Sequence, residues 1–468
     1  MRFFQRSLRR LRRATAFASL VLVGAVLSGC VADVIDRRLN KVVVPDDLPQ
    51  LTDTEKTAHR KLFVVDLHAD SMLWNRDLLE KADWGHVDLP RLVEGNVALQ
   101  VFAMVTKTPF KGRAPKDAVL IPEIAGSKDA TCMRHDSLNL AGLLQVAQGR
   151  PTRTWFDLEQ RALYQAERLK AIIAQSQQDY RDDPRPETRR LMLIRDAADL
   201  ETLIDARTRG ENVVGALIAL EGAHWIGDQQ PDIEAGVSAL ADAGFRMLAP
   251  THRFNNALSG AGEGCDQLAG LTEAGRAFLR KAHASDMILD LAHASDSGIA
   301  EAAATAEGPL VISHTGVRKN CDNLDRCVIE RNMRDEDIQA IARTGGVVAI
   351  GYWPEAVGLG MRHVVEGFRN ARRALSAPAF VAEMKARDGR YDPLDHISLG
   401  SDYDGAVQVP FDTAGVGYIT TALARDGFSE AAVRKIAGGN ACRVFATRLP
   451  GGSDAMARRI CAPYLGAP

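Results

Sequence analysis

Apolar and polar positions follow one repeating unit along the chain: a short apolar run rich in β-branched residues, a polar junction and an amphipathic helical stretch. Apolar strands that alternate with helices are typical of a parallel sheet whose outer face is covered by helices. Helical periodicity is clear over residues 273–284 and 335–344. The pattern predicts eight strands, over residues 62–66, 98–105, 214–220, 245–249, 287–291, 310–312, 347–351 and 396–400.

Eight such strands predict an α/β fold in which the sheet closes into a TIM-like (β/α)8 barrel over residues 59–450, followed by a tail at 451–468. The connection between the second and third strands, about 106–213, is far longer than an ordinary crossover. We interpret this connection as an insertion over the barrel mouth that contains a β-hairpin or a lid.

The first thirty residues have the features of an export signal. Six arginines precede an apolar run over residues 16–27 that is too short to span a bilayer comfortably. The run ends in Leu27-Ser28-Gly29-Cys30, which resembles a bacterial lipobox. The resemblance implies cleavage after residue 29 and a lipid on the sulfur of Cys30. An ordinary signal peptide and a short anchor helix are the alternatives.

Residues 30–58 are predicted to be a lipid-anchored tether, because they contain prolines and show little periodicity. The expected location is the bacterial cell envelope. Val31, rather than an aspartate, follows Cys30, which resembles the pattern for outer-membrane retention facing the periplasm. Paired arginines also match twin-arginine signals, so the export route stays open.

Charge and cysteine content narrow the class of protein. Removal of residues 1–29 takes away six of the 58 basic residues and none of the 60 acidic residues, so the mature chain carries a net charge of −8. This charge argues against nucleic acid as a partner. Six cysteines remain besides Cys30, and an even number suits disulfides in an oxidising compartment. The pair Cys321 and Cys327 is the most local of fifteen pairings, and no C-x2-C motif supports a cysteine zinc site.

Histidines and carboxylates stand where the predicted strands end. Since the carboxyl ends of barrel strands meet at one mouth, these side chains are expected to converge. His68 and Asp70 are two positions apart and therefore point to the same side of a strand. A mixture of imidazole nitrogens and carboxylate oxygens suits zinc, and a shared carboxylate suits a dinuclear site. The candidate metal ligands are His68, Asp70, Glu221, His293 and His314.

Seven segments between about residues 61 and 447 together resemble the membrane (renal) dipeptidase family, which consists of zinc peptidases on an amidohydrolase-type barrel. The H-x-D motif at His68 is itself distinctive, because most other amidohydrolase barrels have H-x-H there. The segments are VDLHAD (65–70), ALEGAH (219–224), DLAHAS (290–295), ISH (312–314), RN (331–332), LGSDYDG (399–405) and GNACRVF (439–445).

The resemblance implies a cofactor of two Zn²⁺ ions and hydrolysis of dipeptides by a hydroxide that bridges them. His68 and Asp70 would hold one ion, His293 and His314 the other, and Glu221 both. The small-molecule dipeptide would carry a free C-terminal carboxylate.

Three further residues acquire roles from the same resemblance. His252 would face the substrate carbonyl, Arg331 would bind the substrate carboxylate, and Asp402 would transfer protons. The chain departs from the family pattern around residues 319–330, so Arg318 and Arg326 compete with Arg331. Asp404 is either a support for the metal ligands or part of an Asp-rich turn, and His224 and His283 are interpreted as structural.

Two other functions stay open. A dizinc hydrolase of cyclic amides or lactones would use the same ligands. A peptide-binding lipoprotein without catalytic activity would lack at least one ligand, and none of the five is missing. A homodimer is an analogy only, based on how often exposed barrel helices support dimers.

Overall fold

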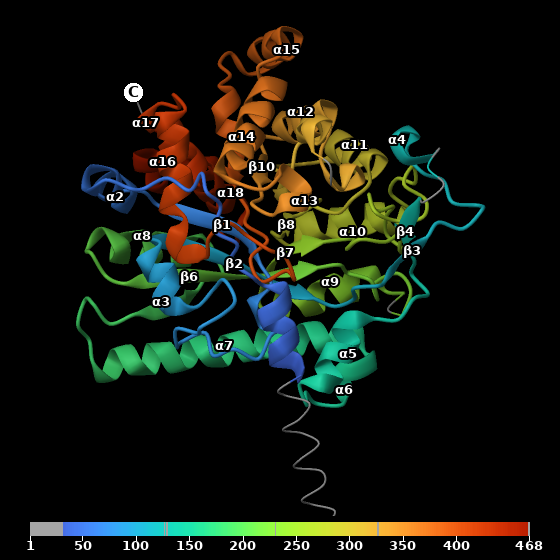
Figure 1. Ribbon diagram of the computed structural model, residues 1–468, viewed down its shortest axis with the longest axis horizontal. Coiled ribbons are helices and arrows are strands. Elements are labelled where there is room, and N and C mark those ends of the chain that lie inside the picture. The colour runs from blue at the N-terminus through green and yellow to red at the C-terminus, as the bar shows by residue number, and fades with distance from the viewer. Residues whose placement is uncertain (1–30, 126, 128–129, 230, 325–326, 467–468) are drawn as a thin grey trace, which may run out of the picture.

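The computed structural model describes residues 31–466, apart from 126, 128, 129, 230, 325 and 326. Its centre is a parallel sheet with the strand order β8-β7-β6-β2-β1-β11-β10-β9 (Figure 1). The strands are β1 (Val64–Ala69), β2 (Val97–Val105), β6 (Val213–Glu221), β7 (Phe245–Ala249), β8 (Ile288–Leu289), β9 (Val311–Thr315), β10 (Val347–Ile350) and β11 (Ile397–Leu399).

The two ends of this order meet. Asp290, just after β8, forms a parallel bridge with Val311 of β9, and the backbone N–H of Leu291 donates to the carbonyl of Val311 at 2.8 Å. The sheet therefore curls on itself as a (β/α)8 barrel requires, which confirms the predicted fold class. Every residue of β2 and β6 is buried, because these strands face the barrel core on one side and helices on the other.

The prediction of eight strands is short by one. A ninth, β5 (Arg190–Leu193), lies inside the long insertion and pairs in parallel with the first half of β6, from Val213 to Ala216. The insertion also contains an antiparallel pair, β3 (Lys111–Arg113) and β4 (Thr131–Met133). Its helices are α4 (Pro122–Ala125), α5 (Leu140–Ala147), α6 (Arg153–Phe156), α7 (Leu158–Asp182) and α8 (Ala197–Thr208).

The remaining helices mostly surround the barrel (Figure 1). The predicted helices at 273–284 and 335–344 correspond to α10 and α12. Within the described residues, no helix combines the length and apolar character needed to cross a membrane. The helices are α3 (Leu89–Glu94), α9 (Ile233–Asp242), α10 (Glu273–Ala284), α11 (Asp296–Thr305), α12 (Asp335–Arg343), α13 (Pro354–Val357), α14 (Met361–Leu375), α15 (Pro378–Asp388), α16 (Gly417–Arg425) and α17 (Glu430–Arg434).

Both terminal regions are more ordered than a tether or a tail. Residues 31–39 form a helix, and α2 (Asp53–Arg60) begins with a capping box between Thr52 and Glu55. At the other end, α18 (Asn440–Arg448) and α19 (Asp454–Ile460) pack together and are joined by a disulfide. Most of the expected tether and tail therefore belongs to the folded domain.

All six cysteines of the described residues form disulfides, as an oxidising compartment predicts. Cys321 pairs with Cys327, the local pair expected from the sequence. The others are Cys132 with Cys265 and Cys442 with Cys461.

Candidate active site

Five buried side chains converge at the carboxyl ends of the barrel strands. His68 lies near the end of β1 and Asp70 directly follows that strand. Glu221 is the last residue of β6, His293 follows β8, and His314 lies in β9. Since parallel strands of a barrel share one mouth, residues far apart in the sequence meet there. The structure thus brings together all five predicted metal ligands.

Glu221 is at the centre of this cluster. Its Oε1 atom lies 2.8 Å from Nε2 of His293 and 3.5 Å from Nε2 of both His68 and His314. Two groups of three residues each have ligand atoms within 4.8 Å of one another, and Glu221 belongs to both. One group adds His68 and Asp70, and the other adds His293 and His314. The arrangement is two neighbouring sites with one shared carboxylate.

The chemistry of the cluster fits divalent cations. Nε2 of His68, Oδ1 of Asp70 and Oε2 of Glu221 are buried without a hydrogen-bond partner, which is costly unless another ligand satisfies them. Burial, together with neighbouring carboxylates, raises the pKa of Asp70 and Glu221 well above their usual values. Burial lowers the pKa of His293 and His314 well below the usual value, so both imidazoles are neutral and can donate a lone pair. Neutral imidazoles beside crowded carboxylates match the ligand preferences of zinc.

Asp402 lies beside the same ligands. It follows β11, and the ligand atoms of Asp402, His68 and His314 all lie within 4.8 Å of one another. Desolvation in this crowded environment raises the pKa of Asp402 to about 7. Its backbone has φ 60°, in the left-handed region that non-glycine residues rarely adopt, as does Asp404 with φ 63°. The tight loop after β11 thus turns the Asp402 side chain back toward the mouth.

Asp404 points away from the metal-ligand cluster and holds the loop. It is fully buried, forms an ion pair with Arg76 at 2.6 Å and accepts hydrogen bonds from Ser71 and the backbone of His86. Burial alone would raise the pKa of Asp404, but the charge and hydrogen bond of Arg76, together with His86 and Ser71, outweigh burial and the pKa is lowered. Asp404 is therefore a structural support of the loop that carries Asp402.

His252 follows β7 and lies at the edge of the cluster. Its Nδ1 is 2.8 Å from the carbonyl oxygen of Lys107, which can only accept, so Nδ1 carries the hydrogen. The neutral ring then directs the Nε2 lone pair toward Oε2 of Glu221, 3.6 Å away. Burial lowers the pKa of His252 to about 3.

Arg331 is buried at the site rather than on a solvated face. It ends a short 3-10 helix (Ile329–Arg331), and its guanidinium donates to the carbonyl oxygens of Ala292 and His314. These contacts tie together the segments that carry His293 and His314. Arg318 instead pairs with Asp296 at 3.1 Å, and Arg326 lies outside the described residues.

His224, one of the two histidines interpreted as structural, contacts Asn256 and Phe254. Nδ1 of His224 is 3.1 Å from the Asn256 amide, and its ring stacks on Phe254 with centroids 4.1 Å apart. Gly222, next to Glu221, has φ +89°, and a Cβ atom there would lie 2.3 Å from His224. Only glycine therefore allows the backbone to turn so sharply beside the shared carboxylate.

Sequence reasoning missed an ion pair at the rim of the site. Arg253 binds Glu263 through two hydrogen bonds of 2.9 and 3.0 Å, and Oε2 of Glu263 lies 4.0 Å from Nδ1 of His293. The pKa of Glu263 is lowered to about 2, because the charge and hydrogen bonds of Arg253, with smaller contributions from Lys111 and Arg331, together overcome the effect of burial. The adjacency of Arg253 to His252 was the only sequence signal of this pair.

The insertion contributes to the same rim. Lys111 of β3 forms an ion pair with Glu330 at 2.9 Å, next to Arg331. The disulfide between Cys132 and Cys265 joins β4 to the segment after His252. The predicted β-hairpin over the mouth thus corresponds to β3 and β4.

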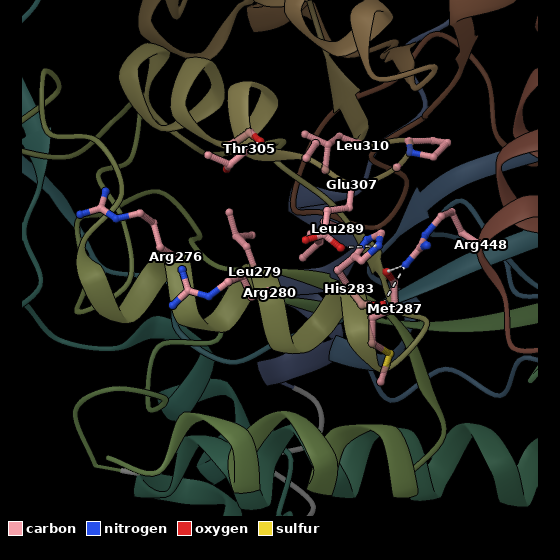
Figure 2. Close-up of a pocket in the computed structure, with 14 residues that line it drawn as sticks. Arg276, Leu279, Arg280, His283, Met287, Leu289, Thr305, Glu307, Leu310 and Arg448 are labelled. Atoms are coloured by element: carbon pink, nitrogen blue, oxygen red, sulfur yellow. Dashed lines mark hydrogen bonds and ion pairs between the residues drawn. The ribbon is translucent and has the colours of Figure 1, made fainter.

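A cavity of about 270 Å³ lies elsewhere, between α10, α11 and the amino ends of β8 and β9 (Figure 2). Its charged groups are paired: His283 lies 3.4 Å from Glu307, and Arg276 lies 3.1 Å from Glu301. None of the candidate site residues lines it. The cavity is therefore a gap between barrel helices at the end opposite the cluster.

Comparisons with known proteins bear on the family to which the chain belongs. The chain aligns at 26% identity over 267 residues with an uncharacterized protein from the pqqA 5' region of Klebsiella pneumoniae, covering 54% of this chain and 88% of that protein. A dipeptidase AC crystal structure described as a family M19 metallopeptidase has a TM-score of 0.57 at 21% identity, covering 83% of this chain and 99% of the other. A Rhodobacter sphaeroides metallopeptidase, solved with a phosphinate mimic of the dipeptide L-Ala-D-Ala, has a TM-score of 0.56 at 20% identity over the same shares.

A third solved structure, a probable dipeptidase from Pseudomonas aeruginosa, has a TM-score of 0.56 at 17% identity and covers 86% of this chain and 98% of its own. At these identities the structural likenesses establish the fold. The family model for membrane dipeptidase (peptidase family M19) matches residues 52–449, nearly the whole barrel. The chain therefore belongs to the membrane dipeptidase family of zinc-dependent metallopeptidases.

Proposed function

We propose that the protein hydrolyses dipeptides that carry a free C-terminal carboxylate, with two zinc ions in the cluster around Glu221. The observation that carries this proposal is the pair of three-residue groups that share Glu221. His68 and Asp70 would hold one ion, and His293 and His314 the other. Zinc held by these residues would supply a nucleophile at neutral pH, because a bound divalent cation lowers the pKa of water.

The surrounding residues suit the handling of protons and developing charge. Asp402 lies beside the proposed zinc ligands His68 and His314. From this position its carboxylate would take a proton from the attacking water and pass it to the leaving amine. His252 would meet the negative charge that develops on the carbonyl oxygen. Since burial keeps the ring neutral and its Nδ1–H is bound to Lys107, Nε2 would make this contact only if the developing negative charge raised the pKa of His252 enough for Nε2 to take up a proton.

Arg331 is proposed to select short substrates. Two of its N–H groups are bound to Ala292 and His314, and the rest of the guanidinium remains for a substrate carboxylate. A carboxylate held there would place the scissile bond at a fixed distance from the metal ligands. The Lys111–Glu330 ion pair lies next to Arg331, where it would limit the room for chains longer than a dipeptide.

The decisive test is hydrolysis of L-Ala-L-Ala, L-Ala-D-Ala and tri-Ala with zinc and after chelation. The stereoisomer is included because one structural neighbour was solved with a mimic of L-Ala-D-Ala. We expect zinc-dependent cleavage of at least one dipeptide and none of the tripeptide. Equal cleavage of the tripeptide would refute the carboxylate role of Arg331. Cleavage of a β-lactam or lactone but of no dipeptide would favour the hydrolase of cyclic amides or lactones. Binding of dipeptides without turnover would favour the peptide-binding lipoprotein.

We further propose that the protein is exported and anchored through a lipid on Cys30, at the outer membrane facing the periplasm. The basic and apolar stretches and the LSGC sequence support this location, as do three disulfides. The mass of the mature N-terminal peptide tests it. A cysteine with a diacylglyceryl group on its sulfur is expected at residue 30, and Cys30→Ser should release the protein from the membrane fraction.

A further inference from the structure

The helix over residues 31–39 is fixed to the barrel by its polar side. Ala32, Asp36 and Asn40, spaced four residues apart, are all buried. Asp36 accepts hydrogen bonds from Arg76 at 2.9 Å and from Trp84 at 3.0 Å. A buried carboxylate that accepts two hydrogen bonds, one of them from a charged guanidinium, is a strong attachment. This helix is therefore held against the barrel rather than free to move as a linker.

The opposite side of the same helix faces solvent and carries apolar residues together with Arg38, which lies four positions after Val34. Val34 is 62% exposed and Val31 is 54% exposed. This arrangement inverts the usual one, in which the apolar face of a surface helix is buried. Exposed basic residues are interspersed with these apolar side chains at Arg37, Arg38 and Lys41, and the Arg37 guanidinium lies 3.6 Å from the centre of the Trp84 ring. The exposed apolar residues are Val31, Val34, Ile35, Leu39, Val42 and Val44.

A second exposed apolar group lies on α5 and α6. Just after α5, the Gln148 side chain donates a hydrogen bond to the carbonyl of Leu73 at 3.0 Å. The Arg150 side chain donates one to the carbonyl of Trp74 at 3.1 Å. The residue that holds the first helix, Arg76, belongs to the same short segment, and Figure 1 shows α5 and α6 beside that helix. The exposed residues are Leu143, Val146 and Phe156, the last of them 85% exposed.

The sequence places the predicted lipid directly next to this surface. Cys30 immediately precedes Val31, and one residue spans at most about 3.6 Å, so no free tether separates the acyl chains from the helix. We propose that the apolar stripe of residues 31–44, together with the exposed side chains of α5 and α6, lies in the headgroup region of the bilayer. This inference rests on the proposed lipid at Cys30.

A bilayer fits this surface better than a second copy of the chain. Exposed apolar side chains accompanied by basic residues, whose charged ends can reach the headgroups, are typical of helices that lie in the interface of an anionic membrane. A twofold contact through the same stripe would bring Arg37, Arg38 and Lys41 of both copies together. Since Arg76 also pairs with Asp404, the bilayer would lie beside the loop that carries Asp402. The active-site mouth would then open close to the membrane surface.

The test uses the mature lipoprotein in vesicles of phosphatidylethanolamine and phosphatidylglycerol. Because the native cysteines of the folded domain are in disulfides, single Val34→Cys, Phe156→Cys and Glu187→Cys variants can each be labelled with an environment-sensitive fluorophore. Glu187 is the matched control: it is exposed and lies just before the amino end of β5, away from the mouth. Retained dipeptidase activity verifies that each variant is folded.

We expect brominated lipids to reduce the emission of the labels at 34 and 156 by roughly twofold or more, and not that at 187. If the protein floats with the vesicles but iodide in the water quenches all three labels equally, the inference is wrong and the anchor stands. Crosslinking between copies through residue 34, without quenching by lipid, would assign the stripe to a second copy. Absence of lipid on Cys30 would refute the anchor and the inference together.

Discussion

The Oγ atom of Ser313 lies 2.9 Å from Nδ1 of His314. The hydroxyl hydrogen of Ser313 is donated to Asp290 at 2.6 Å, so toward His314 the oxygen acts as an acceptor. Nδ1 of His314 therefore carries the ring hydrogen, and Nε2 keeps the lone pair that faces the metal-ligand cluster. The Asp290, Ser313 and His314 chain sets the tautomer of a proposed zinc ligand.

Replacement of Ser313 by alanine should weaken zinc binding. Loss of such a supporting hydrogen bond typically lowers metal affinity by about 10- to 100-fold. Competition with a chelator of known affinity measures the change. Ser398→Ala is the matched control, because this buried serine of β11, another strand of the same barrel, has no hydrogen-bond partner for its Oγ. An equal loss in both variants would mean that the effect comes from packing rather than from the tautomer.

Replacement of Glu221 by glutamine should abolish the dinuclear site. The amide keeps the size of the side chain but removes the charge that both groups of ligands share. We expect fewer than two zinc equivalents per chain by elemental analysis, and a fall in kcat of about 1000-fold or more, the scale of losing a principal electrostatic group. Glu201→Gln is the control, because Glu201 pairs with Arg459 on α19, far from the mouth. Two bound equivalents and full activity in Glu221→Gln would contradict the shared role.

The barrel was predictable because its strands carry a signal that tertiary context does not alter. Strand β7 is bounded as predicted, since its apolar run stops sharply at Pro250. The ninth strand, β5, was missed because Arg190 opens a run of only four residues directly after a segment rich in proline and arginine. The metal-ligand cluster was predictable for a related reason: His68 and Glu221 end strands whose direction is already fixed.

Other features depend on contacts that local sequence does not encode. The helix over 31–39 buries Asp36 and exposes Val34, so a hydrophobic pattern gives the wrong face. Its stability depends on Arg76, a distant partner in the sequence. Similarly, Arg253 and Glu263 meet only because the loop after β7 folds back on itself. Hydrophobic periodicity carries no information about such pairs.

The disulfide between Cys132 and Cys265 should matter more for catalysis than for stability. It joins the β3 and β4 hairpin to the segment after His252, whereas Cys442 and Cys461 lie in a hydrophobic core. We expect the Cys132→Ser and Cys265→Ser double variant to raise KM severalfold with a small change in Tm. The matched Cys442→Ala and Cys461→Ala double variant should lower Tm and leave KM unchanged. Kinetics and thermal unfolding of both proteins decide, and the reverse pattern would show that the hairpin does not shape the mouth.

His396 should make the protein less stable in mild acid. It is buried, its ring stacks on that of Tyr391, and its Nδ1 donates a hydrogen bond to the carbonyl of Gly346 at 2.9 Å. Burial, with a further contribution from Arg443, lowers its pKa from 6.5 to about 4. Between these two values the unfolded chain binds a proton that the folded chain excludes, so stability falls as the pH drops from 6.5 toward 4. Below pH 4 both states are protonated and this loss stops growing.

The difference between pKa values of 6.5 and about 4 corresponds to at most about 3 to 4 kcal/mol, because one pKa unit is worth about 1.4 kcal/mol. His396→Gln keeps a donor for Gly346 but cannot be protonated, so its free energy of unfolding should depend less on pH. Urea unfolding of parent and variant at several pH values across this window measures the effect. The difference between them removes the contribution of the zinc ligands, which both proteins share. His135→Gln, at an exposed histidine, is the control and should follow the parent. If the free energies of unfolding of the parent and His396→Gln depended on pH in the same way, the pKa of His396 would be the same in the folded and unfolded chains.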